Sequence, residues 1–201
     1  MKSVLTSIQP KGCELIANGS KTIEVRKTKP KIKTPFKCYI YCTLPPRSEF
    51  FWHDDREYTA DNFLCKKVIG EFVCNKIENI EIRHFTVFGH ENRYASVGEN
   101  PDNQWLKHSC LAYDEVVAYG KLAPLYGWHI SDLVIYDKPK ELSDFATFCK
   151  GTGSETDKIC KNCRYLCFDD NPINGYTRCR ANKRKTLTRP PQSWCYVEEL
   201  R

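Results

Sequence analysis

The sequence lacks any long apolar run: none of its 201 residues lies in a stretch that approaches the roughly 20 apolar residues of a membrane-spanning helix. It also lacks a signal peptide, an internal repeat and a low-complexity tract. We therefore expect a cytoplasmic protein without a membrane partner. With 41% hydrophobic and 28% charged residues, the chain has the composition of a globular protein that can bury one good core.

Cysteine, in contrast, is abundant, with 12 residues in the chain. Because no secretory signal is present, a disulfide framework is not expected. Eight cysteines are scattered, mostly through apolar segments in which a free thiol packs as a small hydrophobic group. These are Cys13, Cys38, Cys42, Cys65, Cys74, Cys110, Cys149 and Cys195.

The other four cysteines are clustered within 20 residues, with a C-x-x-C spacing at their start. They are Cys160, Cys163, Cys167 and Cys179. Four thiolates can close a tetrahedral site, so we predict a structural Zn²⁺ there, and the metal would help to fold a polar segment. An iron–sulfur cluster or free, redox-active thiols are the alternatives. Residues 149–190 are therefore predicted to form a small four-cysteine zinc module.

The net charge of +6 is unevenly distributed. Residues 1–40 hold nine basic and two acidic residues, and residues 150–190 hold ten and four, whereas residues 41–149 hold eleven and seventeen. Two basic ends around an acidic centre favour a nucleic-acid partner. A charge that serves solubility alone is the alternative.

Short strand-like segments, two or three helices and no regular strand–helix alternation predict an α+β fold. We expect a small, partly closed barrel of mixed strands over residues 1–148, although periodicity does not separate it from an open sheet. A terminal strand within residues 191–201 is expected to pack back on this barrel. The predicted strands cover residues 2–8, 22–27, 36–43, 67–80, 81–88, 128–136 and 194–197, and the predicted helices cover 10–18, 112–119 and 142–149. Residues 28–35, 44–66 and 89–110 are expected to be loops.

One stretch, residues 19–27, stands out within this pattern. Gly19 follows the predicted helix and suits a C′ position with positive φ. The strand that follows places Glu24 and Arg26 on one face, next to a turn that carries Lys21. A cation, a carboxylate and a bidentate guanidinium could recognise or hydrolyse a polar ligand, such as a base with its phosphate. A solvated strand face with cross-strand ion pairs is the alternative.

These residues resemble the opening of ASCH (ASC-1 homology) domains, which belong to the PUA-like superfamily. The resemblance rests on the segments Ser7–Pro10, Asn18–Arg26, Tyr113–Tyr119 and Tyr126–Ile130, and it extends in blocks over about residues 2–148. The G-x-K-T-I-x-x-R element is its most specific part. The ending at residues 189–197 resembles the tail of phage-type members.

The resemblance implies a PUA-like β-barrel with a cleft beside the first helix that takes RNA or modified nucleosides. It places Lys21, Glu24 and Arg26 at this cleft, with Gln9 and Tyr41 on its wall. Some small bacterial members are amidohydrolases that deacetylate N4-acetylcytidine with a Lys, a Thr and a Glu. The Lys matches Lys21, but Glu24 stands at the Thr position and no acid occurs near Ser109.

A binding protein is therefore the first hypothesis, with RNA favoured. The nucleic-acid-binding residues would be Gln9, Lys21, Thr22, Glu24, Arg26, Lys27, Tyr41, Lys183, Arg184 and Lys185. The second hypothesis is a hydrolase acting on a modified nucleoside or RNA, in which Glu24 activates water and Lys21 lies near the oxyanion. The third is a zinc-dependent adaptor that binds another protein.

Overall fold

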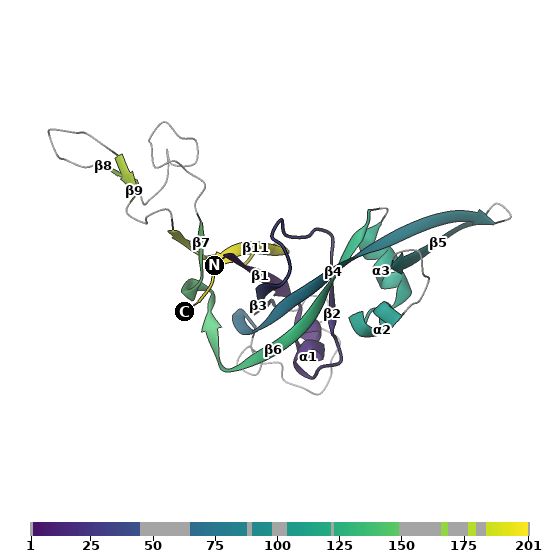
Figure 1. Cartoon of the computed structure of the whole chain (residues 1–201), viewed down its shortest axis with the longest axis horizontal. Helices are drawn as coiled ribbons and strands as arrows, with labels where there is room; N and C mark the ends of the chain where they lie inside the picture. Colours follow the sequence, from purple (N-terminus) through teal and green to yellow (C-terminus); the bar gives the residue numbers. More distant parts are fainter. Residues whose placement is uncertain are drawn as a thin grey trace.

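The computed structural model describes residues 2–44, 65–87, 90–97, 104–121, 123–148, 166–168, 177–179 and 184–200. Its main feature is a mixed seven-stranded sheet (Figure 1). The strand order is β11 (Trp194–Glu198), β1 (Lys2–Ile8), β3 (Phe36–Cys42), β4 (Lys67–Val87), β6 (Leu125–Glu141) and β2 (Ile23–Arg26), and β5 (His90–Val97) pairs with the distal part of β4. Strands β1 and β3 are parallel, whereas the other pairs are antiparallel. The predicted α+β class is therefore confirmed.

In the described ranges, three α-helices accompany this sheet: α1 (Pro10–Ala17), α2 (Gln104–Ser109) and α3 (Tyr113–Gly120). Helix α1 begins with a proline, which suits a first-turn position because that N–H has no intrahelical partner. It ends before Gly19, whose φ of 77° confirms the predicted left-handed C′ position. In the described part of the chain, no helix has the length and apolar character needed to cross a bilayer.

The core is divided between the two faces of the central strands. Val4, Ile8, Ile40 and Cys42 belong to one buried cluster together with Trp128. Leu5, Tyr39 and Tyr41 face the other way and pack in a second cluster with Phe145. Alternate residues of β1 and β3 thus enter opposite cores, as the two-residue period of a strand requires.

The two ends of the sheet approach each other. The path runs from β11 to β2, and within the described residues no backbone ladder joins these two strands. The ring of Trp128 on β6 nevertheless lies 6.0 Å from that of Trp194 on β11, so the sheet curls. Arg26 of β2 crosses the remaining seam, since its guanidinium donates to the Ser7 carbonyl oxygen and to Ser193 Oγ. A side chain, rather than a strand ladder, closes this side of the sheet.

Five of the predicted elements were wrong. The strands predicted at 67–80 and 81–88 are one strand, β4 (Lys67–Val87), in which three register shifts disrupt the regular periodicity, and residue 88 lies outside the described residues. Residues 89–110 contain β5 and α2 rather than a loop alone. Strand β6 does not end at Lys138-Pro139-Lys140, because residues 136–139 fall in a register shift where a missing N–H is tolerated. The predicted helix at 142–149 is a 3₁₀ turn, Leu142–Asp144, followed by β7 (Ala146–Phe148).

Candidate functional site

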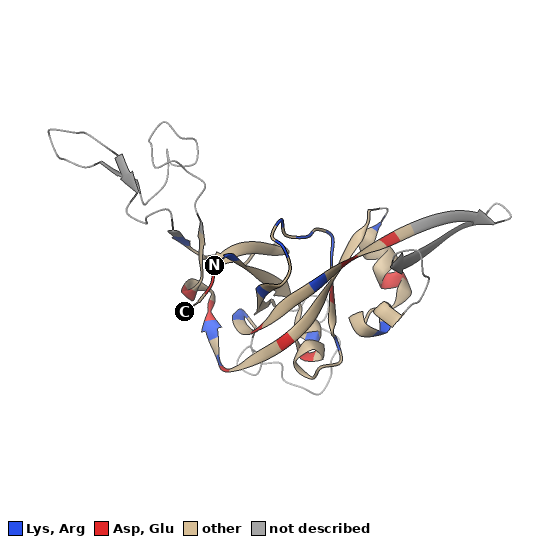
Figure 2. Ribbon diagram, viewed as in Figure 1, with Lys and Arg blue, Asp and Glu red and all other residues tan. Residues whose placement is uncertain are grey.

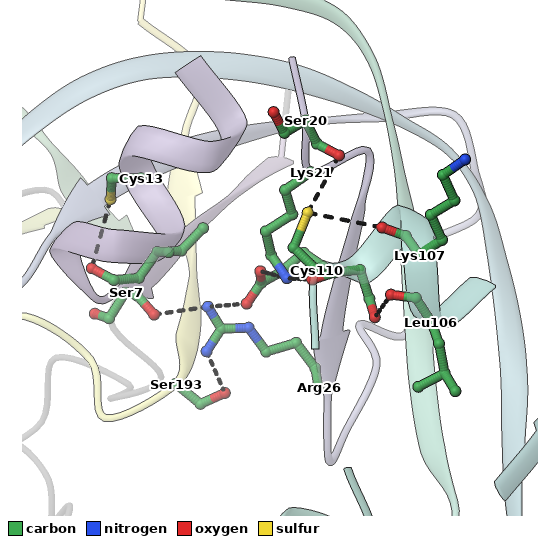
Figure 3. Close-up of polar contacts among 12 residues, drawn as sticks. Ser7, Cys13, Ser20, Lys21, Arg26, Leu106, Lys107, Cys110 and Ser193 are labelled. Atoms are coloured by element: carbon green, nitrogen blue, oxygen red, sulfur yellow. Dashed lines mark hydrogen bonds and ion pairs between the residues drawn. The ribbon is translucent and has the colours of Figure 1, made fainter. Parts of the chain in front are cut away.

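Lys21, Glu24 and Arg26, which we term the ion cluster, form the charged centre of the candidate site (Figure 3). Lys21 Nζ lies 3.4 Å from Glu24 Oε2, and an Arg26 guanidinium nitrogen lies 3.0 Å from Glu24 Oε1. The three residues are only 6%, 7% and 6% exposed. The alternative of a solvated face with cross-strand ion pairs was therefore wrong: the charges are buried, and Glu24 pairs with neighbours along its own chain segment.

The sheet explains why these charges are buried. Glu24 lies opposite Trp128 in the β2–β6 register, on the strand face that the curled sheet covers. The intervening residues Ile23 and Val25 enter a third apolar cluster with Trp105 and Val116. Both faces of β2 are consequently enclosed, and its ionic face needs internal partners to offset desolvation.

Backbone carbonyl groups supply those partners. Lys21 Nζ donates to the Ser109 carbonyl oxygen at 2.5 Å, and an Arg26 nitrogen donates to the Ser7 carbonyl oxygen at 2.6 Å. Figure 3 shows the Arg26 guanidinium between Ser7 and Ser193, with the Lys21 ammonium group nearby. Two cations thus share one carboxylate, and the cluster has one positive charge in excess.

One donor in the cluster has no partner. Arg26 Nε is buried, and no described residue accepts a hydrogen bond from it. Trp128 Nε1 is a second such donor, on the residue that faces Glu24 across the β2–β6 pair. Buried donors without acceptors are costly, so both favour an additional acceptor at this place.

Helix α2 borders the cluster on one side. Thr22 donates its backbone N–H to the His108 carbonyl oxygen, and its Oγ1 lies 3.2 Å from His108 Nδ1. The Cys110 thiol, just after this helix, donates to the Ser20 carbonyl oxygen at 3.2 Å. These contacts fix the turn from which Lys21 enters the cluster.

A loop rich in lysine begins directly after Arg26. It comprises residues 27–33 and exposes Lys27, Lys29, Lys31 and Lys33, and we term it the lysine loop (Figure 2). The Lys27 ammonium lies 4.6 Å from the centre of the Tyr119 ring, and that of Lys29 lies 5.1 Å from the Tyr126 ring. These cation–π contacts orient two of the four charges without neutralising them.

Strand β11 and the residue before it hold this loop and the ion cluster together. Trp194 Nε1 donates to Thr28 Oγ1 at 2.9 Å, and the Lys31 backbone N–H donates to the Tyr196 hydroxyl at 2.6 Å. Ser193, directly before β11, contacts Arg26. The spacing of the lysines is therefore set by contacts with a segment more than 160 residues away in the sequence.

The other predicted binding residues lie at several places. Gln9 is exposed at the start of α1, whereas Tyr41 is buried in the second core cluster. Lys185 is exposed on β10 (Arg184–Thr186), which pairs with β7. Arg184 begins the same strand, and Lys183 lies outside the described residues.

The predicted zinc ligands fall mostly where the structure is not described. Cys160 and Cys163 lie outside the described residues. Cys167 and Cys179 belong to β8 (Leu166–Phe168) and β9 (Thr177–Cys179), which pair so that Cys179 is opposite Leu166 and Cys167 opposite Arg178. Among the residues that are described, no group of three or more His, Cys, Asp or Glu side chains is arranged to hold a metal ion.

Sequence reasoning missed the groups that complete the ion cluster. The carbonyl groups of Ser7 and Ser109 act through the backbone, so their residue types give no signal. Ser193 and Trp194 lie in the terminal segment, and nothing in its sequence pattern links them to residues 26–28.

No protein-family model matches the sequence, and no curated protein matches it either. Among solved structures, the chain is similar to an ASCH protein from Zymomonas mobilis, with a TM-score of 0.45 and 17% identity over 70% of this chain and 73% of that one. Two variants of that protein, a tyrosine-to-phenylalanine and a serine-to-alanine substitution, also have TM-scores of 0.45, with 16% and 17% identity, and cover 71% and 70% of this chain and 77% and 74% of theirs.

Proposed function

We propose that the chain is an ASCH-type nucleic-acid-binding protein that favours RNA. The lysine loop would hold the phosphate backbone, and the ion cluster would recognise a polar edge of a base or modified nucleoside. The observation that carries this proposal is the juxtaposition of the two: four exposed lysines follow directly after a buried cluster with one excess positive charge.

The solvation of the charged groups supports these separate roles for the lysine loop and the ion cluster. Exposed lysines lose little solvation when they meet a phosphate, and each contact releases counterions from the nucleic acid. The Arg26 Nε–H can donate a hydrogen bond to a carbonyl oxygen or ring nitrogen of a base, which would be the acceptor that the described residues do not supply. The preference for RNA over DNA rests on the sequence resemblance to ASCH domains.

Fluorescence anisotropy of labelled single-stranded RNA across a salt series tests this function. The double variant Lys31→Gln/Lys33→Gln removes two charges whose side chains have no described contact, and it keeps the backbone bond from Lys31 to Tyr196. We expect weaker binding at low salt and a slope of log K against log salt that is lower by up to about 1.4, or 0.7 for each phosphate contact with a single strand.

The matched control is Lys66→Gln/Lys138→Gln, which removes one exposed lysine directly before β4 and one within β6. It should bind as the wild type does. Equal weakening in both variants would show that the affinity depends on net charge and not on the lysine loop. Single-stranded DNA of the same sequence, tested in parallel, decides the preference for RNA. Absence of salt-sensitive binding at low salt would refute the proposed function.

Hydrolysis of a modified nucleoside is a second candidate, because Lys21 Nζ and Glu24 Oε2 are within 3.4 Å. Glu24 would take a proton from water while Lys21 stabilises the developing oxyanion. Both Glu24 oxygens are already paired, so a substrate would have to displace one cation. In an assay of acetate release from N4-acetylcytidine, Lys21→Ala should abolish turnover, whereas Lys27→Ala should retain it.

We also propose that the four clustered cysteines hold a structural zinc ion next to the basic run that includes Lys185. Metal analysis of the purified chain should give about one zinc per chain, as expected for a closed four-thiolate site. Cys163→Ser should lower both the zinc content and the melting temperature. A zinc content well below one per chain would refute this assignment.

A further inference from the structure

Three cysteines that are far apart in the sequence meet at the ends of β1 and β3. Cys42 is the last residue of β3 and pairs with Ile8 of β1, whose carbonyl oxygen accepts a hydrogen bond from the Cys13 thiol at 3.6 Å. Cys65 directly precedes Lys66, whose backbone N–H donates to the Cys42 carbonyl oxygen at 2.8 Å. We term Cys13, Cys42 and Cys65 the thiol cluster. It is separate from the ion cluster and from the four cysteines of the predicted zinc module.

The three sulfur atoms are in hydrogen-bond contact. The thiols of Cys13 and Cys65 both lie against Cys42 Sγ, and the one S–H of Cys13 is shared between this sulfur and the Ile8 carbonyl oxygen. Cys13 and Cys65 pack against the same apolar residues as Cys42, and all three are free thiols. This arrangement surrounds one sulfur atom with two thiol donors, which is the environment that stabilises a thiolate.

The three thiols differ in acidity. The hydrogen bond from Cys13 lowers the pKa of Cys42 against the effect of burial, and the bond from Cys65 lowers it further. The same bond to Cys42, together with burial, raises the pKa of Cys13 far above its usual value. Burial and the charge of Cys42 raise the pKa of Cys65 to about 11. Cys42 is therefore the group in this cluster that loses its proton first.

We propose that Cys42 and Cys65 form a reversible disulfide when the protein meets a hydroperoxide. The geometry favours Cys65 over Cys13 as the second partner. Cys65 is partly exposed, so the cluster can be reached beside it, whereas Cys42 and Cys13 are 3% and 4% exposed. Cys13 is also bound to the Ile8 carbonyl oxygen within the first turns of α1. The bond would join the end of β3 to the start of β4 and close the chain between residues 42 and 65.

The chemistry balances with hydrogen peroxide as the oxidant. The Cys42 thiolate attacks one peroxide oxygen, the O–O bond breaks, and the leaving hydroxide takes up a proton to form water. The Cys65 sulfur then attacks the Cys42 sulfenic acid, and a second water leaves as the S–S bond forms. Two thiols lose two electrons, and one peroxide becomes two waters. A dithiol reductant reverses the reaction by exchange.

The test is peroxide treatment of the full reduced chain, followed by alkylation and non-reducing peptide mapping by mass spectrometry. We expect a Cys42–Cys65 linked peptide, lighter by about 2 Da than the sum of the two reduced peptides, that disappears with dithiothreitol. In Cys65→Ser the link should be lost, and dimedone should label Cys42 as the trapped sulfenic acid. Cys195→Ser is the matched control, since Cys195 is also partly exposed and burial raises its pKa to about 11 as well.

Each outcome decides the proposal. A linked peptide in the wild type and in Cys195→Ser, together with dimedone labelling of Cys42 in Cys65→Ser, supports it. No Cys42–Cys65 peptide, or a Cys13–Cys42 link in its place, overturns it. If circular dichroism shows that Cys65→Ser does not fold, dimedone added with peroxide to the wild type serves instead. It should label Cys42 and lower the yield of the link, and labelling elsewhere with an unchanged yield contradicts the proposal.

Discussion

The ion cluster and the lysine loop occupy adjacent parts of one short segment, residues 21–33, yet they treat charge in opposite ways. In the ion cluster, two cations and a carboxylate are more than nine-tenths buried, and the two cations donate hydrogen bonds to backbone carbonyl groups. In the lysine loop, four cations are exposed. Sequence composition alone would place all of them in one basic patch.

This difference in burial determines which charges a ligand meets first at the surface. A unit charge pair 4 Å apart is worth about 4 kcal/mol at an effective dielectric constant of 20, against about 1 kcal/mol in water. The buried charges therefore interact strongly with one another and with any polar group that enters the ion cluster. The exposed lysines retain their hydration and can exchange it for phosphate contacts. Variants that exchange or remove these charges should separate the two roles.

The largest effect is expected from Glu24→Gln. This change leaves Lys21 and Arg26 buried without their anion, and breaking a buried pair in this way costs about 3–5 kcal/mol of unfolding free energy. Urea denaturation measures the loss. The control is Glu71→Gln, where the carboxylate is partly exposed and pairs with Lys37, and it should cost about 1 kcal/mol or less. Equal losses would contradict the distinction between buried and exposed pairs.

Arg26→Lys should have the next largest effect. The charge is retained, but a lysine cannot bridge the Ser7 carbonyl oxygen, Ser193 Oγ and Glu24 together. We expect a loss of about 1.5–3 kcal/mol, the range for a hydrogen bond to a charged group. Ser193→Ala removes only the 3.5 Å contact and should cost less. A silent Arg26→Lys variant would show that charge alone closes the seam between β2 and β1.

A smaller effect on stability is expected from Tyr196→Phe, which removes the acceptor for the Lys31 backbone N–H. The loss should be about 0.5–1.5 kcal/mol in denaturation experiments. RNA affinity should fall several-fold even though no charge changes, because the lysines lose their fixed spacing. Unchanged affinity in anisotropy titrations would show that the lysine loop acts through its charge and not through its shape.

The smallest effect on stability is expected at acid pH, where the partly exposed Lys37–Glu71 ion pair is lost. Burial raises the pKa of the Glu71 carboxyl, but hydrogen bonds from Lys37 and Tyr136 outweigh it and hold that pKa below its ordinary value of 4.5. Glu71 therefore stabilises the fold above that value, and its contribution disappears as the pH falls through the lowered pKa. Unfolding free energies measured from about pH 6 to about pH 3 should fall less steeply in Glu71→Gln than in the wild type.

The sequence was most informative where local chemistry decides the structure. Alternation and aromatic content predicted β3, and Pro10 and Gly19 predicted the ends of α1. Strand β5 was missed because its residues, from His90 to Val97, contain little apolar alternation. This strand pairs with β4, so its structure depends on a neighbour rather than on its own pattern.

The candidate site could be predicted only in part for a similar reason. The two-residue period of a strand placed Glu24 and Arg26 on one face, and the structure joins them by an ion pair. Their burial was not predictable, since it depends on the curl of a seven-stranded sheet. The carbonyl partner of Lys21 lies 88 residues away at Ser109, and the hydroxyl partner of Arg26 lies 167 residues away at Ser193.

The position of Ser193 and β11 has a consequence for biosynthesis. Chains are made from the amino end, so β1, α1 and β2 leave the ribosome long before residues 193–196. These later residues contact Arg26, Thr28 and Lys31. During that interval the guanidinium and the lysine loop lack these contacts. A chaperone or an RNA bound during that interval would thus meet a partly assembled cationic surface, which is completed only after residues 193–196 have been made.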